Sequence, residues 1–143
     1  MKKVLFVCHG SICRSPMAEF IFKKTIKDNG LEDAYYCESR AVSSEELGND
    51  IYPPAKRCLD KHQIPYKRHY ATKISNKDYE EFDVIFVMDD SNLYRIKRII
   101  DDDEHKIRKL MDDDIEDPWW TDNFDKVYAE IVEGIEKYLE ENQ

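Results

Sequence analysis

The sequence predicts one α/β domain over residues 1–143, in which helices cover both faces of a parallel sheet. Runs that suit strands alternate with runs that suit helices along the chain, and such alternation gives right-handed β-α-β units. Two of the strand runs are apolar throughout, as strands buried on both faces are. A length of 143 residues also suits a single domain with a sizeable core.

The first strand and the first helix are predicted within the first thirty residues. Residues 3–7 form a run that suits a strand and is continuously apolar from Val4, and a short polar loop follows it. We expect Ser15 to cap the next helix and Pro16 to occupy its first turn, while apolar residues recur at helical spacing over 17–24. Gly30 is a suitable stop for this helix.

We predict two strands and two helices in the middle of the chain. A second strand is expected near residues 34–37, and the two prolines at 53–54 open a helix. Ser75 and Asp78 have the spacing of a capping box and predict a brief helix. Residues 83–88 then form the second strongly apolar strand run.

Two further helices and one weaker strand are predicted in the last third. Residues 89–91 can cap a helix whose apolar stripe falls within 93–100, and 107–111 is a short strand candidate. The clearest helix covers 124–139, where apolar residues follow the spacing of an amphipathic helix closely.

Composition excludes several classes of protein. The 22 Lys and Arg against 31 Asp and Glu give a formal net charge of −9, which argues against nonspecific binding to nucleic acid or to an anionic membrane. A hydrophobic content of 41% is too high for a disordered polar chain. The apolar run behind Lys2 and Lys3 is too short for a secretion signal, and no segment is long enough to span a bilayer. We therefore expect a cytoplasmic protein whose four cysteines are reduced thiols.

The loop after the first strand holds the residues best suited to chemistry. Cys8 and Arg14 bracket five residues between a strand and a helix N-terminus. Backbone N–H groups in such a loop, together with the helix dipole, form a cradle for a tetrahedral oxyanion, and we expect Gly10 to relieve the tight turn. Arg14 can clamp two oxygens at once, and the positive surroundings favour the nucleophilic thiolate form of Cys8.

A second motif supplies the acid that such chemistry needs. Asp117 stands before a proline and two tryptophans, so its carboxyl begins a rigid turn beside an aromatic wall. Aromatic neighbours favour a protonated carboxyl, which could give its proton to a departing oxygen.

These motifs together resemble the low-molecular-weight protein tyrosine phosphatases. Residues 7–19 look like the phosphate loop of that family, and Asp117 falls where the family's general acid lies. Further similarity lies in 41–49 and in 88–93, and the length agrees, so the resemblance covers essentially the whole chain. The combination is specific, although each motif alone is weak.

The resemblance implies a fold and a reaction. The fold would be a three-layer, Rossmann-like or flavodoxin-like domain built on a four-stranded parallel sheet, and the protein would be a monomer. The enzyme would hydrolyse phosphotyrosine in proteins or peptides without metal or cofactor, through a phosphocysteine, and release inorganic phosphate. Cys8 would be the nucleophile, Asp117 would act as acid and then as base, and Ser15 would donate a hydrogen bond to the thiolate. The phosphate would be held by His9, Gly10, Ser11, Ile12, Cys13 and Arg14.

The resemblance also bears on specificity and regulation. Ile12 matches the tyrosine-specific members, whereas related arginine phosphatases have threonine there. Trp119 and Trp120 could stack on a phenyl ring, where the family usually has two tyrosines. Cys13 could form a reversible disulfide with Cys8, or it could simply be a packed thiol.

Two other departures from the family concern the loop and the mouth of the site. Ser11 replaces the family's usual asparagine, a residue suited to unusual backbone angles, which puts the rigidity of the loop in question. Glu45 lies at or next to a position where relatives often have an aromatic residue, and its charge would disfavour acidic substrate flanks.

Several alternatives stay open on the sequence. A phosphate or phosphopeptide binder with little activity would need neither Cys8 nor Asp117, and an arsenate reductase would need further cysteines, of which none follows Cys58. Cys58 and His62 have the spacing of two metal ligands on a helix, but two ligands are too few, so we expect a packed helix face and no metal. His69 is either a hydrogen-bond donor near the loop or a surface histidine.

Overall fold

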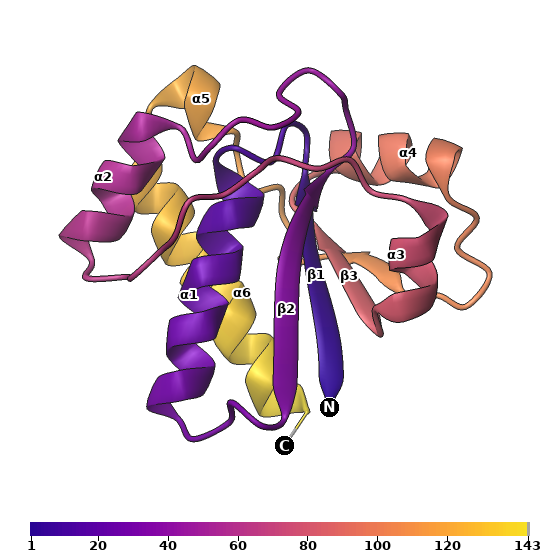
Figure 1. The fold of residues 1–143 in the computed structure, drawn as a ribbon, viewed down its shortest axis with the longest axis horizontal. Coiled ribbons are helices and arrows are strands. Elements are labelled where there is room, and N and C mark those ends of the chain that lie inside the picture. The colour runs from indigo at the N-terminus through magenta and orange to yellow at the C-terminus, as the bar shows by residue number, and fades with distance from the viewer. Residues whose placement is uncertain (143) are drawn as a thin grey trace.

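The structure, a computed structural model, describes residues 1–142, and within them the chain forms four strands and six helices (Figure 1). The strands are β1 (Lys2–Cys8), β2 (Tyr35–Ala41), β3 (Val84–Val87) and β4 (Ile107–Lys109). The helices are α1 (Arg14–Asp28), α2 (Pro53–Lys61), α3 (Asn76–Glu81), α4 (Asp90–Ile99), α5 (Pro118–Thr121) and α6 (Phe124–Glu141).

The sheet has the order β2-β1-β3-β4, and all three pairs of neighbouring strands are parallel. This confirms the predicted four-stranded parallel sheet. The strand β1 lies between β2 and β3, and its last residue, Cys8, is paired in register with Ala41 of β2. Cys8 therefore stands at the carboxyl edge of the sheet, where α/β folds bind their ligands.

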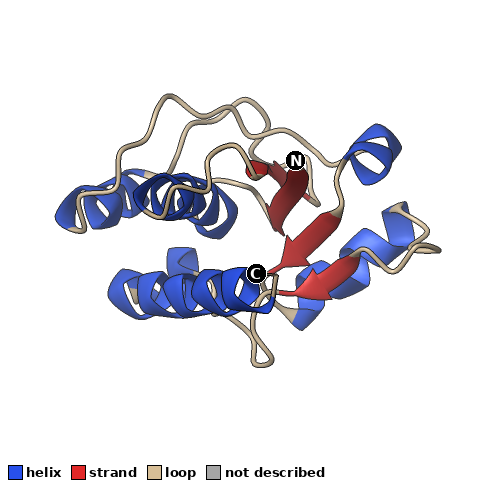
Figure 2. Ribbon diagram, turned by 90° about the horizontal axis from the view of Figure 1, so that it is seen from below, coloured by secondary structure: helices blue, strands red, loops and turns tan. Residues whose placement is uncertain are grey.

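Helices cover both faces of the sheet, as predicted. In Figures 1 and 2, α1 and α6 lie side by side on one face, whereas α3 and α4 lie on the other. Alternate residues of β1 feed the two cores: Val4 and Phe6 belong to the cluster under α1 and α6, and Leu5 and Val7 belong to the cluster under α3 and α4. All four side chains are fully buried, which explains the continuous apolar run of this strand.

The structure corrects three expectations about local elements. Helix α1 begins at Arg14, its N-cap is Cys13, and no side chain caps it, so the predicted capping role of Ser15 is wrong. The second strand runs over Tyr35–Ala41 and is longer than the predicted 34–37. The turn at Asp117 continues into the short helix α5, which the sequence did not predict.

The capping box of the brief helix α3 is confirmed. Ser75 accepts a hydrogen bond from the backbone of Asp78, and the Asp78 side chain accepts one from the backbone of Ser75. The predicted stripe of α4 is confirmed only in part, because Ile96 and Ile100 are buried whereas Ile99 is 38% exposed.

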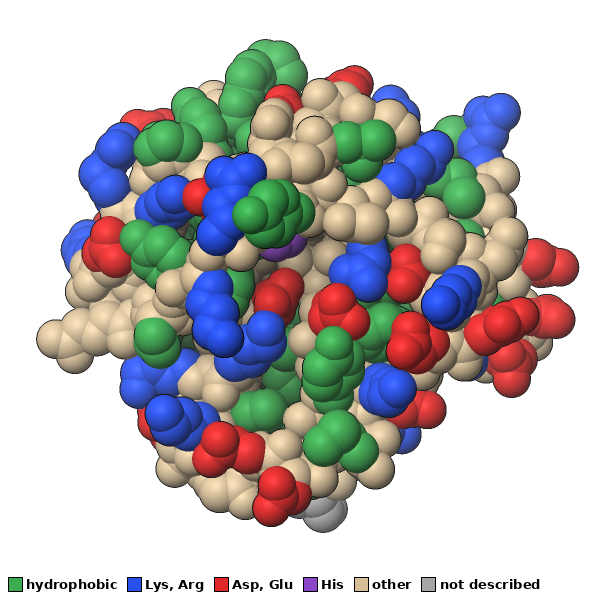
Figure 3. Space-filling view, viewed as in Figure 1, with side chains coloured by type: hydrophobic (Ala, Val, Ile, Leu, Met, Phe, Trp, Pro, Cys, Tyr) green, Lys and Arg blue, Asp and Glu red, His purple; other side chains and the backbone are tan. Residues whose placement is uncertain are grey.

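The surface mixes charges of both signs. Figure 3 shows acidic side chains gathered at one edge, over α3 and the loop that follows α4. Exposed members of these two segments include Glu80, Glu81, Asp101, Asp103 and Glu104. Among the helices of residues 1–142, none is both long enough and apolar enough to cross a membrane.

Candidate active site

The loop between β1 and α1 has a left-handed residue at its centre. Ser11 has φ 57° and is fully buried. That conformation is costly for a residue with a Cβ, so Ser11, and not Gly10, is the residue that makes the tight turn. Gly10 has no positive φ; instead, a Cβ there would come within 3.1 Å of the Glu46 side chain. The prediction that Gly10 relieves the tight turn is therefore wrong. Gly10 instead leaves room for the Glu46 side chain.

Two neighbouring segments hold the loop by its backbone carbonyls. The carbonyl of Cys8 accepts a hydrogen bond from the N–H of Val42, and the carbonyl of Ile12 accepts one from the N–H of Tyr52. The carbonyl of His9 accepts hydrogen bonds from both the N–H and the hydroxyl of Ser43. These hydrogen bonds turn the three carbonyls outward, so the N–H groups of the loop can bind a ligand.

The Cys8 thiol is buried, accepts a hydrogen bond from the backbone of Ser15 and donates one to the Ser15 hydroxyl. The backbone N–H of Ser15 lies 3.4 Å from Cys8 Sγ, and the Ser15 hydroxyl lies 3.3 Å from it. This explains why Ser15 does not cap α1: its side chain turns toward the sulfur atom. The Ser15 hydroxyl also lies 2.8 Å from the Ser11 hydroxyl, so the two serines join the left-handed turn to the thiol.

His69 completes this network from a distant part of the chain. It is 8% exposed, and its Nε2 lies 2.7 Å from the Ser11 carbonyl and 3.3 Å from the Ser11 hydroxyl. Nε2 must carry the proton, because a carbonyl can only accept. Burial lowers the pKa of His69, although the Ser11 carbonyl acts in the opposite direction. Of the two readings left open by the sequence, the structure supports the hydrogen-bond donor near the loop.

Arg14 is fixed almost completely within the protein. Its side chain is 2% exposed, and Nη1 donates to Asp89 Oδ2 and to the Ile115 carbonyl, each at 2.7 Å. Nη2 lies 3.6 Å from Asp117 Oδ2, and within residues 1–142 the buried Nε has no partner. Burial alone would lower the pKa of Arg14, but the negative charges of Cys8, Asp89 and Asp117 together raise it. The guanidinium is therefore charged, oriented and still has a free donor.

Asp89 is a residue of the site that the sequence did not reveal. One of its oxygens caps α4 through the backbone of Asn92 at 2.7 Å, and the other binds Arg14. The sequence predicts only helix capping for residues 89–91. It does not predict that Asp89 also binds Arg14. A usable signal was present, because Asp89 follows a buried strand and so reaches the same sheet edge as Cys8.

Asp117 stands across the pocket from the loop. It caps α5, where Oδ1 accepts a hydrogen bond from the Trp119 N–H at 3.1 Å, and Pro118 begins the helix. Its side chain is 28% exposed, and Oδ2 faces Arg14. The two tryptophan rings stack edge to face at 4.5 Å, with Trp119 46% and Trp120 78% exposed. The carboxyl thus lies between a buried cation and an aromatic pair.

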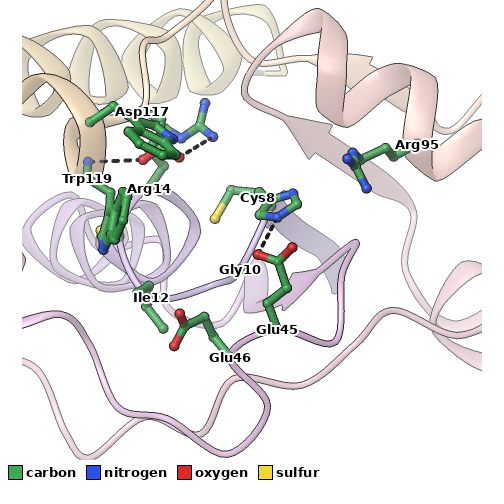
Figure 4. Close-up of a pocket in the computed structure, with 12 residues that line it drawn as sticks. Cys8, Gly10, Ile12, Arg14, Glu45, Glu46, Arg95, Asp117 and Trp119 are labelled. Carbon is green, nitrogen blue, oxygen red and sulfur yellow. Dashed lines mark hydrogen bonds and ion pairs between the residues drawn. The ribbon is translucent and has the colours of Figure 1, made fainter.

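Cys8, Arg14, Asp117 and the two tryptophans line one pocket with a volume of ≈ 330 Å³ (Figure 4). The Cys8 sulfur, the Asp117 carboxyl and the Trp119 ring point into it from different sides. At the mouth, His9 Nε2 and Glu45 Oε2 lie 2.9 Å apart, and Glu46 and Arg95 also line the pocket. The lining residues are Cys8, His9, Gly10, Ile12, Cys13, Arg14, Glu45, Glu46, Arg95, Asp117, Trp119 and Trp120.

The predicted site residues therefore meet in one place, with two exceptions. Ser11 and Ser15 support the loop from behind and do not line the pocket. Cys13 does line it, and the pKa of its thiol is raised, first by burial and then by the charge of Cys8. Glu46 and Arg95 were not anticipated, because nothing in the sequence distinguishes them from other charged surface residues.

The chain matches the family model described as low molecular weight phosphotyrosine protein phosphatase over residues 3–143. A relative with that name from Gallus gallus is 37% identical, and the match covers 98% of this chain and 95% of the relative. The crystal structure of the low molecular weight protein tyrosine phosphatase SP-PTP from Streptococcus pyogenes matches with a TM-score of 0.93 at 35% identity, over 100% of this chain and 94% of that one. The Drosophila arginine phosphatase DARP matches with a TM-score of 0.89 at 32% identity, over 100% and 98%.

Proposed function

Because this chain belongs to the low molecular weight phosphotyrosine protein phosphatase family, whose members are cysteine-dependent hydrolases, we propose that Cys8, Arg14 and Asp117 are its catalytic residues. The observation that carries this assignment is their convergence: a thiol, a buried guanidinium and a carboxyl face one pocket of ≈ 330 Å³. That set of groups can supply a nucleophile, a clamp for the phosphoryl oxygens and a proton donor.

In the first step, the Cys8 thiolate attacks the phosphorus atom of a phosphotyrosine side chain. A sulfur–phosphorus bond forms while the bond from phosphorus to the phenolic oxygen breaks. The Ser15 N–H donates to the sulfur atom at 3.4 Å, and the Ser15 hydroxyl, 3.3 Å away, can also donate once the thiol has lost its proton, so both stabilise the attacking thiolate. In the structure the Cys8 thiol donates to the Ser15 hydroxyl, and that hydroxyl donates to the Arg40 carbonyl. Once Cys8 is a thiolate its sulfur can only accept, so the Ser15 hydroxyl then turns to donate to the sulfur atom, and the Ser11 hydroxyl can donate to Ser15.

Arg14 and the loop N–H groups of residues 9–14 hold the equatorial oxygens of the transferring group. The loop amides precede the N-terminus of α1, where the helix dipole adds positive potential. Arg14 needs little reorganisation, because Asp89 and the Ile115 carbonyl already fix its position. Preorganised donors of this kind stabilise the charge that develops in the transition state.

Asp117 gives a proton to the phenolate that leaves in the first step. In the second step, it takes a proton from water as that water attacks the phosphorus atom, the sulfur–phosphorus bond breaks, and inorganic phosphate departs. The N-cap bond from Trp119 occupies Oδ1, so Oδ2 is the oxygen available for proton transfer.

The pocket supports an aromatic substrate better than a phosphoarginine. Ile12 and Trp119 offer apolar surface on its walls, and a phenyl ring can stack on an indole. A phosphoarginine would bring polar N–H groups against those same walls, where they would lose hydrogen bonds to water. We therefore propose phosphotyrosine in proteins or peptides as the substrate.

The proposal is tested by turnover of matched phosphotyrosine, phosphoserine and phosphoarginine peptides in chelator and reductant. We expect selective release of phosphate from the phosphotyrosine peptide, and its loss in Cys8→Ser. Cys37→Ser is the matched control, because Cys37 is also a buried, free thiol but lies outside the pocket. Preference for phosphoarginine would refute the substrate assignment, and full activity of Cys8→Ser would refute the nucleophile.

We extend the proposal to a cytoplasmic monomer. The cysteines at 8, 13, 37 and 58 are free thiols, and a nucleophilic thiol is best preserved in a reducing compartment. One chain supplies every residue that lines the pocket described here, so a second copy is not needed. Light scattering in dilute solution would contradict the monomer if it gave twice the chain mass of 17.1 kDa.

A further inference from the structure

A second group of chemically reactive side chains lies where α2 meets the start of α6 (Figure 1). Cys58 is on α2, His62 is its C-cap, and Asp125 is in the first turn of α6. One ligand atom from each, namely a sulfur, a ring nitrogen and a carboxylate oxygen, lies within 4.8 Å of the other two. None of the three lines the active-site pocket.

We propose that Cys58, His62 and Asp125 form a binding site for Zn²⁺, with one coordination position left for a solvent molecule. Sulfur, imidazole nitrogen and carboxylate oxygen are the ligands that zinc takes in proteins, and three of them with an open position is a known arrangement. Calcium and magnesium prefer oxygen ligands, so this mixed set favours zinc.

One of the three ligand pairs already has the separation that a tetrahedral ion requires, and the other two pairs lie within 4.8 Å. With zinc–ligand distances of about 2.0–2.1 Å, a nitrogen and an oxygen at the tetrahedral angle stand about 3.3 Å apart. His62 Nε2 and Asp125 Oδ1 are 3.5 Å apart. Cys58 and His62 are four residues apart on one helical face, so both can reach the same ion.

The surroundings already orient two of the ligands. The His62 ring stacks on the Tyr128 ring at 3.7 Å with an angle of 7°, which fixes the plane in which Nε2 points. Lys61 binds Asp125 Oδ2 at 2.8 Å and leaves Oδ1 on the side of His62. Lys61 thus orients the carboxylate, but its charge also competes with a cation.

Cys58 must lose its proton when the ion binds. Its Sγ donates a weak hydrogen bond to the Phe124 carbonyl at 3.6 Å, and burial together with the charge of Asp125 raises its pKa to about 11. Binding therefore replaces the sulfur–hydrogen bond by a sulfur–zinc bond and releases one proton to solvent. The ion would tie α2 to the first turn of α6, only a few residues beyond α5 and Asp117.

The test uses the full chain with Cys8→Ser, so that the active-site thiol cannot supply a competing ligand. Cobalt(II) is the spectroscopic probe, and zinc is titrated by calorimetry. We expect one ion per chain, a sulfur-to-cobalt charge-transfer band that zinc abolishes, and a melting temperature raised by about 4 °C when free zinc is about ten times its dissociation constant.

Matched variants in the same background identify the ligands. We expect Cys58→Ser to lose the charge-transfer band and Asp125→Asn to bind zinc at least about tenfold more weakly, whereas Cys37→Ser changes neither. Lys61→Gln should bind zinc more tightly, because it removes the competing cation. Asp125→Asn keeps the test valid if Cys58→Ser folds poorly, since the Asp125 side chain is 64% exposed. Absence of one-to-one binding, or a band that survives Cys58→Ser, would overturn the site.

Discussion

The left-handed turn at Ser11 predicts that glycine stabilises the fold more than alanine does at this position, which is the reverse of the usual order. Ser11 has φ 57° and is fully buried. The variants Ser11→Ala and Ser11→Gly both remove its hydroxyl. Each variant loses its hydrogen bond to the Ser15 hydroxyl at 2.8 Å, which costs about 0.5–1.5 kcal/mol in the free energy of unfolding. The two variants then differ in the freedom of the backbone and in the Cβ, which only alanine keeps.

The magnitude of that difference follows from two opposing effects. A left-handed conformation costs a residue with a Cβ about 1–2 kcal/mol, which glycine avoids. Glycine in turn loses about 0.5–1 kcal/mol more conformational entropy on folding than alanine does. The two ranges leave a difference of about 0–1.5 kcal/mol, so the glycine variant should be the more stable one by about 0.75 kcal/mol, or about 2–3 °C in melting temperature for a chain of this size.

Urea denaturation of both variants, with Ser44 as a matched position, measures this difference. Ser44 is exposed and has no positive φ, so Ser44→Gly should be less stable than Ser44→Ala. If Ser11→Ala were as stable as Ser11→Gly or more so, the turn would carry no strain, and the account of the loop would be refuted.

Three further predictions concern the acid, the buried histidine and the second cysteine of the pocket. Asp117→Ala should lower kcat/KM for aryl phosphates with poor leaving groups by about 10²–10⁴-fold and for p-nitrophenyl phosphate much less, because kcat/KM reports the step in which the leaving group departs; an equal loss on all leaving groups in a kcat/KM series would contradict the acid role. Because burial lowers the pKa of His69, the unfolded chain takes up its proton first below about pH 6.5, so stability should fall as pH falls through that value. His69→Gln should flatten that slope in urea titrations at several pH values, and an unchanged slope would exclude His69 as its source. Peroxide should convert Cys8 to a sulfenic acid that condenses with the Cys13 thiol to a disulfide and releases water, so thiol should restore activity in the wild type but much less in Cys13→Ser; equal recovery of both would exclude Cys13 from redox protection.

Much of the fold could be predicted because its strongest signals are local. The strand β1 and the helix α6 follow directly from an apolar run and from helical spacing. The strand β2 was predicted too short because it is an edge strand, and residues such as Glu38 and Arg40 alternate with buried ones along it. An edge strand lacks the continuous apolar run that marks a strand buried on both faces.

The residues of the site likewise include some that are close together in the sequence and others that are far apart. The loop from Cys8 to Arg14 is contiguous in sequence, so its spacing and its strand–helix context could be recognised together. Asp89 and His69 reach the loop from 75 and 58 residues away, and no local pattern links them to it. The third ligand of the proposed zinc site, Asp125, is likewise 63 residues from His62, which is why two ligands alone predicted only a packed helix face.

The error at Ser15 shows where local rules fail. Capping preferences describe what a hydroxyl does when the helix N-terminus is its best partner. Here the Ser15 side chain turns toward the Cys8 sulfur. Cys13 is the N-cap residue of α1, and its side chain makes no capping hydrogen bond. The departure from the local rule occurs at the residue beside the proposed nucleophile, as is expected where function competes with helix stability.

The most direct test of the central claim is to trap the covalent intermediate on Cys8. Asp117→Ala is mixed rapidly with p-nitrophenyl phosphate, whose leaving group needs no acid, and the reaction is quenched and digested for mass spectrometry. Because Asp117 also activates water in the second step, the variant should accumulate a phosphoryl group on the peptide that contains Cys8. Turnover with no phosphoryl group on Cys8, or with one on another residue, would contradict the assignment of Cys8 as the nucleophile.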